Sequence, residues 1–162
     1  MPDQNFTPKQ ALPKIKHFCA YQERCHSEVK EKLYSYSLSK DDVEVIISQL
    51  IEDNFLNEER FAIHFAHGKF SIKHWGRIKI KIELKKKQVS EYCIKTALEK
   101  IEEIPYMLTL NKLAAAKLKT LKTEKNKFIR RHQLQYYLRM KGFEGNIIND
   151  VIDEMEKAES GG

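Results

Sequence analysis

One pattern recurs three times along the chain and restricts its fold more than any other feature. Leu33, Leu84 and Leu138 can be aligned, 51 and then 54 residues apart. Five further positions, counted from these leucines, are apolar in all three copies: Val29, Ile80 and Leu134; Leu38, Val89 and Phe143; Val43, Ile94 and Ile148; Ile47, Leu98 and Ile152; Leu50, Ile101 and Met155. Periods of this length indicate tandem copies of one unit, each unable to bury its apolar face alone.

Helix signals are present throughout the copies. Ser39 opens a Ser-Lys-Asp-Asp sequence that resembles a capping box, and Asn57 and Ser90 precede further apolar helix stripes as caps. Pro105 suits the first turn of another helix, and Gly142 suits the end of a helix that stops just before it. Each copy is therefore predicted to hold three helices, the second of which ends near the aligned leucine.

Residues 78–84 carry a pattern that locally favours a strand. Apolar and charged residues alternate strictly there, as they do in a half-buried strand. The equivalent segments of the first and third copies do not alternate. We therefore predict that residues 76–87 form a helix.

That helix would carry two apolar stripes. Ile80 and Leu84 share one side, while Trp75, Ile78 and Ile82 lie roughly opposite. A middle copy has a neighbour on either side, so packing of both stripes is the favoured interpretation. The alternative is that the second stripe is an exposed docking patch.

Length and composition agree with an all-α protein. The 162 residues are 41% apolar and 32% charged, with only six Gly and four Pro, which is too few for a sandwich of many short strands. We expect a tail, 1–10, followed by three three-helix modules, 11–56, 57–104 and 105–162. The beginning lacks the layout of a signal peptide, and three Cys without framework spacing favour a reducing cytoplasm.

Charge is arranged in blocks. Segment 69–87 carries +7 and segment 112–141 carries +9, so the remaining residues carry −10. Such blocks favour an extended polyanion or an acidic protein surface as partner, although solvated helix faces explain any single block equally well. Trp75, Tyr136 and Tyr137 lie among these cations and could stack on bases, but a core position is favoured for the two tyrosines.

A cation recurs at one position of the repeat. Arg77 and Arg131 each precede an aligned leucine by seven residues, and His26 occupies that position in the first copy. A core does not require this recurrence, so it indicates a surface that is used more than once. The residues expected to bind a partner or DNA are Lys73, Trp75, Arg77, Lys81, Lys85, Lys86, Lys87, Arg130, Arg131 and Arg139.

Metal and catalytic motifs are weak. His17, Cys19, Cys25 and His26 are close in sequence, but their spacing does not fit a standard zinc site, and His17 and Cys19 diverge on a helix. Buried cysteines and surface histidines are the favoured interpretation. No nucleophile motif, phosphate loop or dinucleotide fingerprint is present. We therefore expect no metal, no cofactor and no enzymatic activity.

Three short sequences resemble the RecX family of recombination regulators. Phe55–Ala62 is similar to that family's leucine, acidic pair and Arg-Phe-Ala signature. Gly76-Arg77-Ile78, followed by Glu83-Leu84 and Val89-Ser90, resembles its second block, with Gln88 where the family usually has Gly. Ser27–Leu33 resembles its first-copy element. The order and spacing extend over about residues 11–157, which makes the resemblance fairly specific.

The resemblance implies a fold and a function. RecX-like proteins are all-α, with three tandem three-helix modules in an elongated, curved array that has no right angles and no sheet. They bind the RecA nucleoprotein filament in the cytoplasm and inhibit its ATPase, recombinase and coprotease activities in DNA repair, homologous recombination and the SOS response. The chain would then act as a monomer that reaches DNA mainly through the filament. The alternative is a helical protein that binds DNA directly through its basic second helices.

Overall fold

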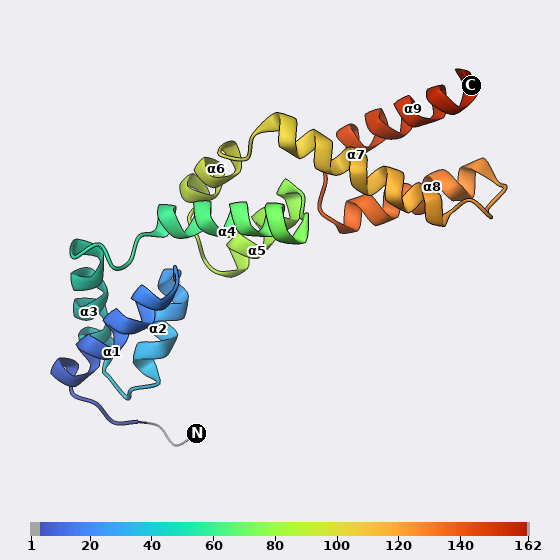
Figure 1. Cartoon of the computed structure of the whole chain (residues 1–162). Helices are drawn as coiled ribbons and strands as arrows, with labels where there is room; N and C mark the ends of the chain where they lie inside the picture. Colours follow the sequence, from blue (N-terminus) through green and yellow to red (C-terminus); the bar gives the residue numbers. More distant parts are fainter. Residues whose placement is uncertain (1–3, 162) are drawn as a thin grey trace. The chain divides into compact units, whose positions relative to one another are not determined.

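The computed structural model describes residues 4–161, and these residues form nine α-helices and no strand (Figure 1). None of these helices is long and apolar enough to cross a membrane. In chain order they are α1 (Pro8–Tyr21), α2 (His26–Tyr34), α3 (Lys40–Glu52), α4 (Glu58–Lys73), α5 (Arg77–Lys86), α6 (Glu91–Glu99), α7 (Glu103–Thr120), α8 (Lys127–Met140) and α9 (Gly145–Gly161). The all-α prediction is confirmed, as is a helix over the alternating segment.

Local capping explains where several helices begin. Thr7 forms a complete capping box with Gln10, so α1 begins at Pro8, three residues before the expected start of the first module. The Ser39 side chain accepts from the backbone N–H of Asp42, and Asn57 and Ser90 accept in the same way at α4 and α6. The predicted caps are therefore confirmed.

The repeat positions form the core. All of the aligned apolar residues are buried except Leu98 and Met155, which are partly buried. The repeat pattern predicts a fully buried position for Leu98 as well, and the structure buries it only in part. This residue stands one position before the end of α6, in the last turn of that helix.

The chain divides into two compact units. The first comprises residues up to Phe65 together with Leu84–Ala97, and the second comprises Ala66–Glu83 together with residues from Leu98 onward. In the first unit, α1, α2 and α3 pack against one another (Figure 1). Their shared core is lined by residues such as Ile15, Leu33 and Leu50, each of them fully buried.

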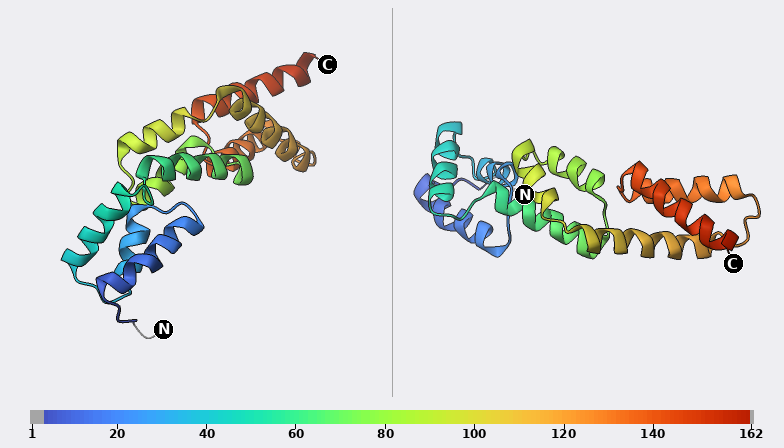
Figure 2. Two further views of the ribbon diagram at one scale, coloured as in Figure 1. Left: turned by 60° about the vertical axis from the view of Figure 1, so that its left-hand side comes forward. Right: turned by 90° about the horizontal axis from the view of Figure 1, so that it is seen from above.

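In the second unit, α7, α8 and α9 pack together (Figure 2). The ring of Tyr106 is fully buried there, with its centroid 5.7 Å from that of Phe70 and 5.1 Å from that of Phe143. Tyr106 therefore ties the end of α4 to the turn between α8 and α9. Tyr136 is exposed, so the expectation of a core position is wrong for it, while Tyr137 is partly buried beside Lys117.

A left-handed residue ends the second helix of every copy. Ser37, Gln88 and Gly142 each follow the aligned leucine by four residues, and their φ angles are +63°, +63° and +97°. This conformation favours glycine, because any other side chain crowds the backbone. Gln88 nevertheless adopts it, so the turn that the resemblance associates with glycine forms here without one.

Two hydrogen bonds, which we call joints, connect second helices, and their acceptors occupy equivalent repeat positions. In the first unit, Ser27 at the start of α2 donates its hydroxyl to the carbonyl of Lys87, 2.9 Å away. In the second unit, the backbone N–H of Gly76, just before α5, donates to the carbonyl of Lys141 at 2.8 Å. Both acceptors lie three residues after an aligned leucine. The start of one second helix therefore joins the end of the next.

Candidate functional site

The outward side of α5 carries an apolar ridge. Ile80 and Leu84 are fully buried on one side of the helix, while Ile78 and Ile82 on the other side are 44% and 48% exposed. The interpretation that both stripes are packed is therefore wrong for these two isoleucines. Only the side of α5 toward Ile80 and Leu84 enters a core, so the second stripe lies at the surface.

Lysines border the ridge on both sides. At roughly 100° per residue, Lys81 and Lys85 lie along one side of Ile78 and Ile82, and Lys79 and Lys86 along the other. We call these six residues the α5 outer face. Lys81 is exposed, and Lys85 lies 3.6 Å from Glu91 through an exposed ion pair that contributes little. The face therefore combines half-exposed apolar surface with positive charge.

The neighbouring Trp75 is partly buried. The Lys79 Nζ lies 4.6 Å from its ring centroid, and the Lys69 Nζ lies 5.0 Å away. The indole is thus covered by cations of its own chain. Lys73 is exposed, and its carbonyl accepts from the Lys141 Nζ at 3.1 Å. Neither residue is part of the α5 outer face.

Arg77 serves as an anchor inside the second unit. Its guanidinium donates to Glu103 at 2.7 Å and to Glu144 at 3.0 Å, and it lies 3.8 Å from the ring centroid of Tyr106. The Tyr106 hydroxyl accepts from the Arg77 backbone N–H at 3.0 Å and donates to Glu144. These groups join the starts of α5, α7 and α9.

The pKa values of this cluster follow from its contacts. Burial alone would lower the pKa of Arg77, but the hydrogen bonds that it donates to Glu103 and Glu144 outweigh this effect and raise that pKa. Burial also raises the pKa of the Tyr106 hydroxyl, and the hydrogen bond to Glu144 raises it further. The arginine therefore stays charged and the tyrosine neutral, as this arrangement requires.

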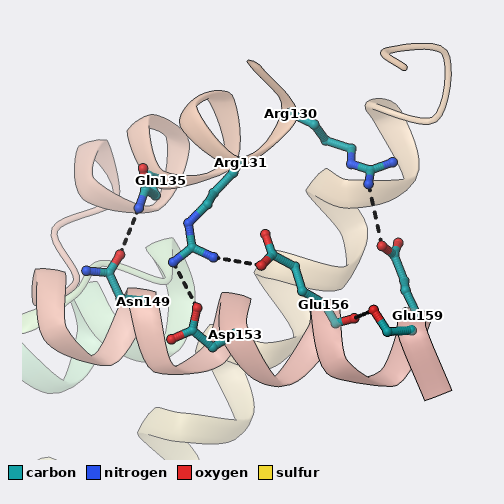
Figure 3. A network of polar contacts seen from close by, with 8 residues as sticks. Arg130, Arg131, Gln135, Asn149, Asp153, Glu156 and Glu159 are labelled. Carbon is teal, nitrogen blue, oxygen red and sulfur yellow. Dashed lines mark hydrogen bonds and ion pairs between the residues drawn. The ribbon is translucent and has the colours of Figure 1, made fainter. Parts of the chain in front are cut away.

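Arg130 and Arg131 of α8 face α9, as Figure 3 shows. Arg131 lies 2.9 Å from Asp153 and 3.0 Å from Glu156, and Arg130 lies 3.5 Å from Glu159. Burial would lower the pKa of Arg131, but the two hydrogen-bonded carboxylates raise it. Both arginines thus contact their own module.

The remaining expected residues are scattered. Lys87 binds Glu28 at 3.1 Å within the first unit, and Lys86 and Arg139 are exposed. Of the ten residues expected to bind a partner, Lys81, Lys85 and Lys86 lie on the α5 outer face. Lys79 was missed there, although its angular position could have identified it. Partner binding by all ten stays a prediction.

Metal-binding geometry is absent from residues 4–161, where no group of three or more His, Cys, Asp or Glu could hold an ion. Cys19, Cys25 and Cys93 are buried free thiols. Burial raises the pKa of Cys19 and Cys25 and keeps both in the unreactive thiol form.

Over residues 4–161, the nine helices and the repeated turns between them define an all-α repeat protein. Residues 57–98 match the family model for the second three-helix domain of RecX. The chain is 30% identical over 131 residues to the regulatory protein RecX of Pelodictyon phaeoclathratiforme, covering 80% of this chain and 79% of the relative. The chain belongs to the RecX family.

Two further comparisons agree. The chain is 27% identical over 143 residues to the regulatory protein RecX of Oceanobacillus iheyensis; the match covers 88% of this chain but 52% of that relative, or about half its length. The crystal structure of RecX from Lactobacillus salivarius superposes with a TM-score of 0.83 at 23% identity, covering 92% of this chain and 96% of that one. The likeness to this crystal structure shows the fold alone.

Proposed function

We propose that the chain binds the RecA nucleoprotein filament and lowers its ATPase, recombinase and coprotease activities, with the α5 outer face as part of the contact. It would act in the cytoplasm as a monomeric regulator rather than as an enzyme. DNA would be reached mainly through the filament.

The observation that carries the proposal is the half-exposed pair Ile78 and Ile82 between lysines. A polyanion would pair with the lysines but would make no favourable contact with the isoleucine side chains. A protein surface with apolar and acidic groups would contact both, because apolar burial supplies affinity and charge supplies orientation. The ridge also lies within residues 57–98, the part of the chain that matches the family model.

The test is a titration of DNA-dependent ATP hydrolysis by RecA. A filament regulator inhibits at concentrations too low to coat the DNA. A direct DNA binder acting through basic second helices inhibits only near saturation of the lattice, with a steep dependence on salt. The second result would favour the alternative function.

A variant pair tests the α5 outer face itself. Ile78→Ser with Ile82→Ser should weaken inhibition about tenfold or more, since each substitution removes apolar burial that contributes about 1 kcal/mol. Ile104→Ser, at an exposed isoleucine of α7, is the matched control and should inhibit like the parent. Equal inhibition by the double variant and the control would place the contact elsewhere, for example on the acidic third helices.

A further inference from the structure

A concavity of about 550 Å³ lies on the first module, away from α5 in sequence. Residues of α1, α2 and the flanking turns line it, including Lys14, Phe18, Tyr21, Arg24, Lys32 and Tyr36. Its volume lies in the range of sites that hold small ligands. Among residues 4–161 no carboxylate lines it, and the described lining side chains include the cations Lys14, Arg24 and Lys32.

Aromatic rings and cationic side chains lie next to one another in this concavity. The Arg24 guanidinium lies 3.7 Å from the ring centroid of Phe18, and the Lys32 Nζ lies 5.7 Å from the same centroid. The Lys32 Nζ is also 5.8 Å from the ring of Tyr36. Arg24 and Lys32 therefore both lie beside the ring of Phe18, and both line the same concavity.

Arg24 is held in place, whereas its charge is not neutralised. Its Nε donates to the carbonyl of Phe18 at 3.1 Å, which fixes the guanidinium over the ring. Within residues 4–161, neither Arg24 nor Lys14 nor Lys32 lies within 4 Å of a carboxylate. This differs from Arg77 and Arg131, whose charge is taken up by acidic side chains. Uncompensated cations in a concavity attract an anion.

Tyr21 supplies a second kind of contact. Its side chain is 77% exposed although it lines the concavity. An exposed aromatic ring in the same concavity as these cations provides a surface on which a planar base can stack while its phosphate contacts a cation. An acidic peptide would use the cations and leave this ring unused.

We propose that this concavity binds a nucleotide unit, with the phosphate at Arg24 and Lys32 and the base against Tyr21. The unit could belong to a free nucleoside phosphate or to an exposed nucleotide of single-stranded DNA, which present the same chemistry. The proposal does not depend on the proposed action on RecA.

The test follows amide chemical shifts of the ¹⁵N-labelled full chain, because other basic surfaces would obscure a bulk binding signal. The probes are thymidine 5′-monophosphate, an eight-residue oligothymidylate, an abasic oligomer of equal length and an octaglutamate peptide. Both thymidine probes should shift amides of residues 13–36. If the oligomer binds here much more tightly than the monophosphate, the site binds single-stranded DNA. If the two probes bind with equal affinity, the site binds free nucleotides. Either result supports the proposal.

Matched variants separate stacking from charge. Tyr21→Ala should weaken oligothymidylate binding at this site about tenfold, as expected when a base stack is removed, whereas Tyr92→Ala, at a tyrosine 71% exposed, should not. Lys32→Gln should reduce the salt slope by up to about 0.7, because each phosphate of a single strand that a cation neutralises contributes roughly that amount. Lys30→Gln removes equal charge from the same helix outside the concavity and should leave the slope unchanged.

Three results would overturn the proposal. One is that neither thymidine probe shifts residues 13–36. Another is that the abasic oligomer or the glutamate peptide binds there as tightly as oligothymidylate. The third is that Tyr21→Ala binds like the parent.

Discussion

Arg77 illustrates how a side chain that is notable in the sequence can serve the fold. Replacing it with Gln removes the charge that Glu103 and Glu144 share. We expect the free energy of unfolding to fall by about 1–3 kcal/mol, since the substitution breaks hydrogen bonds to charged groups in a partly buried site. Urea unfolding measures this. Arg139→Gln, at an exposed arginine, should change it by less than about 0.5 kcal/mol; equal effects would contradict the anchoring role.

His26 occupies the same repeat position in the first unit but has no such partner. Its Nε2 is buried and makes no hydrogen bond within residues 4–161. Burial lowers the pKa of His26 and outweighs the opposing effect of Glu58, while Lys30 lowers it further. The folded chain therefore holds this proton less tightly than the unfolded chain does.

The consequence is a dependence of stability on pH. The contribution of neutral His26 is complete above the unfolded pKa of about 6.5, and it is lost as the pH falls through that value toward the lower folded pKa. Between pH 7.5 and 5.5 the parent should lose more stability in urea unfolding than His26→Gln does. His132→Gln, at an exposed histidine, should follow the parent. Parallel pH profiles for parent and His26→Gln would contradict the prediction.

At the scale of elements, the left-handed turn after each second helix fixes where that helix ends. Gln88 adopts φ +63° although it is not glycine, at a cost of about 1 kcal/mol. Gln88→Gly should therefore raise the free energy of unfolding by about that amount. Gln49→Gly, in the interior of α3, should lower it by about 1 kcal/mol. A destabilised Gln88→Gly variant would show that its side chain contributes more than its backbone strain costs.

Helices could be predicted from the sequence where neighbouring residues, or a pattern repeated in all three copies, determine them. The caps at Ser39, Asn57 and Ser90 follow from neighbouring residues, and comparison of three copies identified α5 despite its alternation. The pairing of Arg77 with Glu144, 67 residues away, could not be predicted, because it depends on how modules meet. For the same reason the sequence could not decide whether Ile78 and Ile82 are covered.

At the scale of the whole molecule, the joints depend on close backbone approach. A Cβ on Gly76 would lie 2.4 Å from the carbonyl carbon of Gly142, so Gly76→Ala should force the second joint apart and cost about 1–3 kcal/mol. Gly68→Ala, in the interior of α4 with nothing within 4 Å, should instead stabilise by about 0.5–1 kcal/mol. Thermal unfolding of the two variants compares them directly, and equal shifts would contradict a tight joint.

The joints also give the repeat a polarity, because the start of one second helix always meets the end of the next. In the third module, Arg131 near the start of α8 pairs with Asp153 and Glu156 of α9 in the same module, whereas Arg77 pairs with Glu103 at the start of α7 and with Glu144 just before α9. The same repeat position is thus used in two ways: Arg77 links its helix to elements that follow it in the chain, whereas Arg131 pairs within its own module.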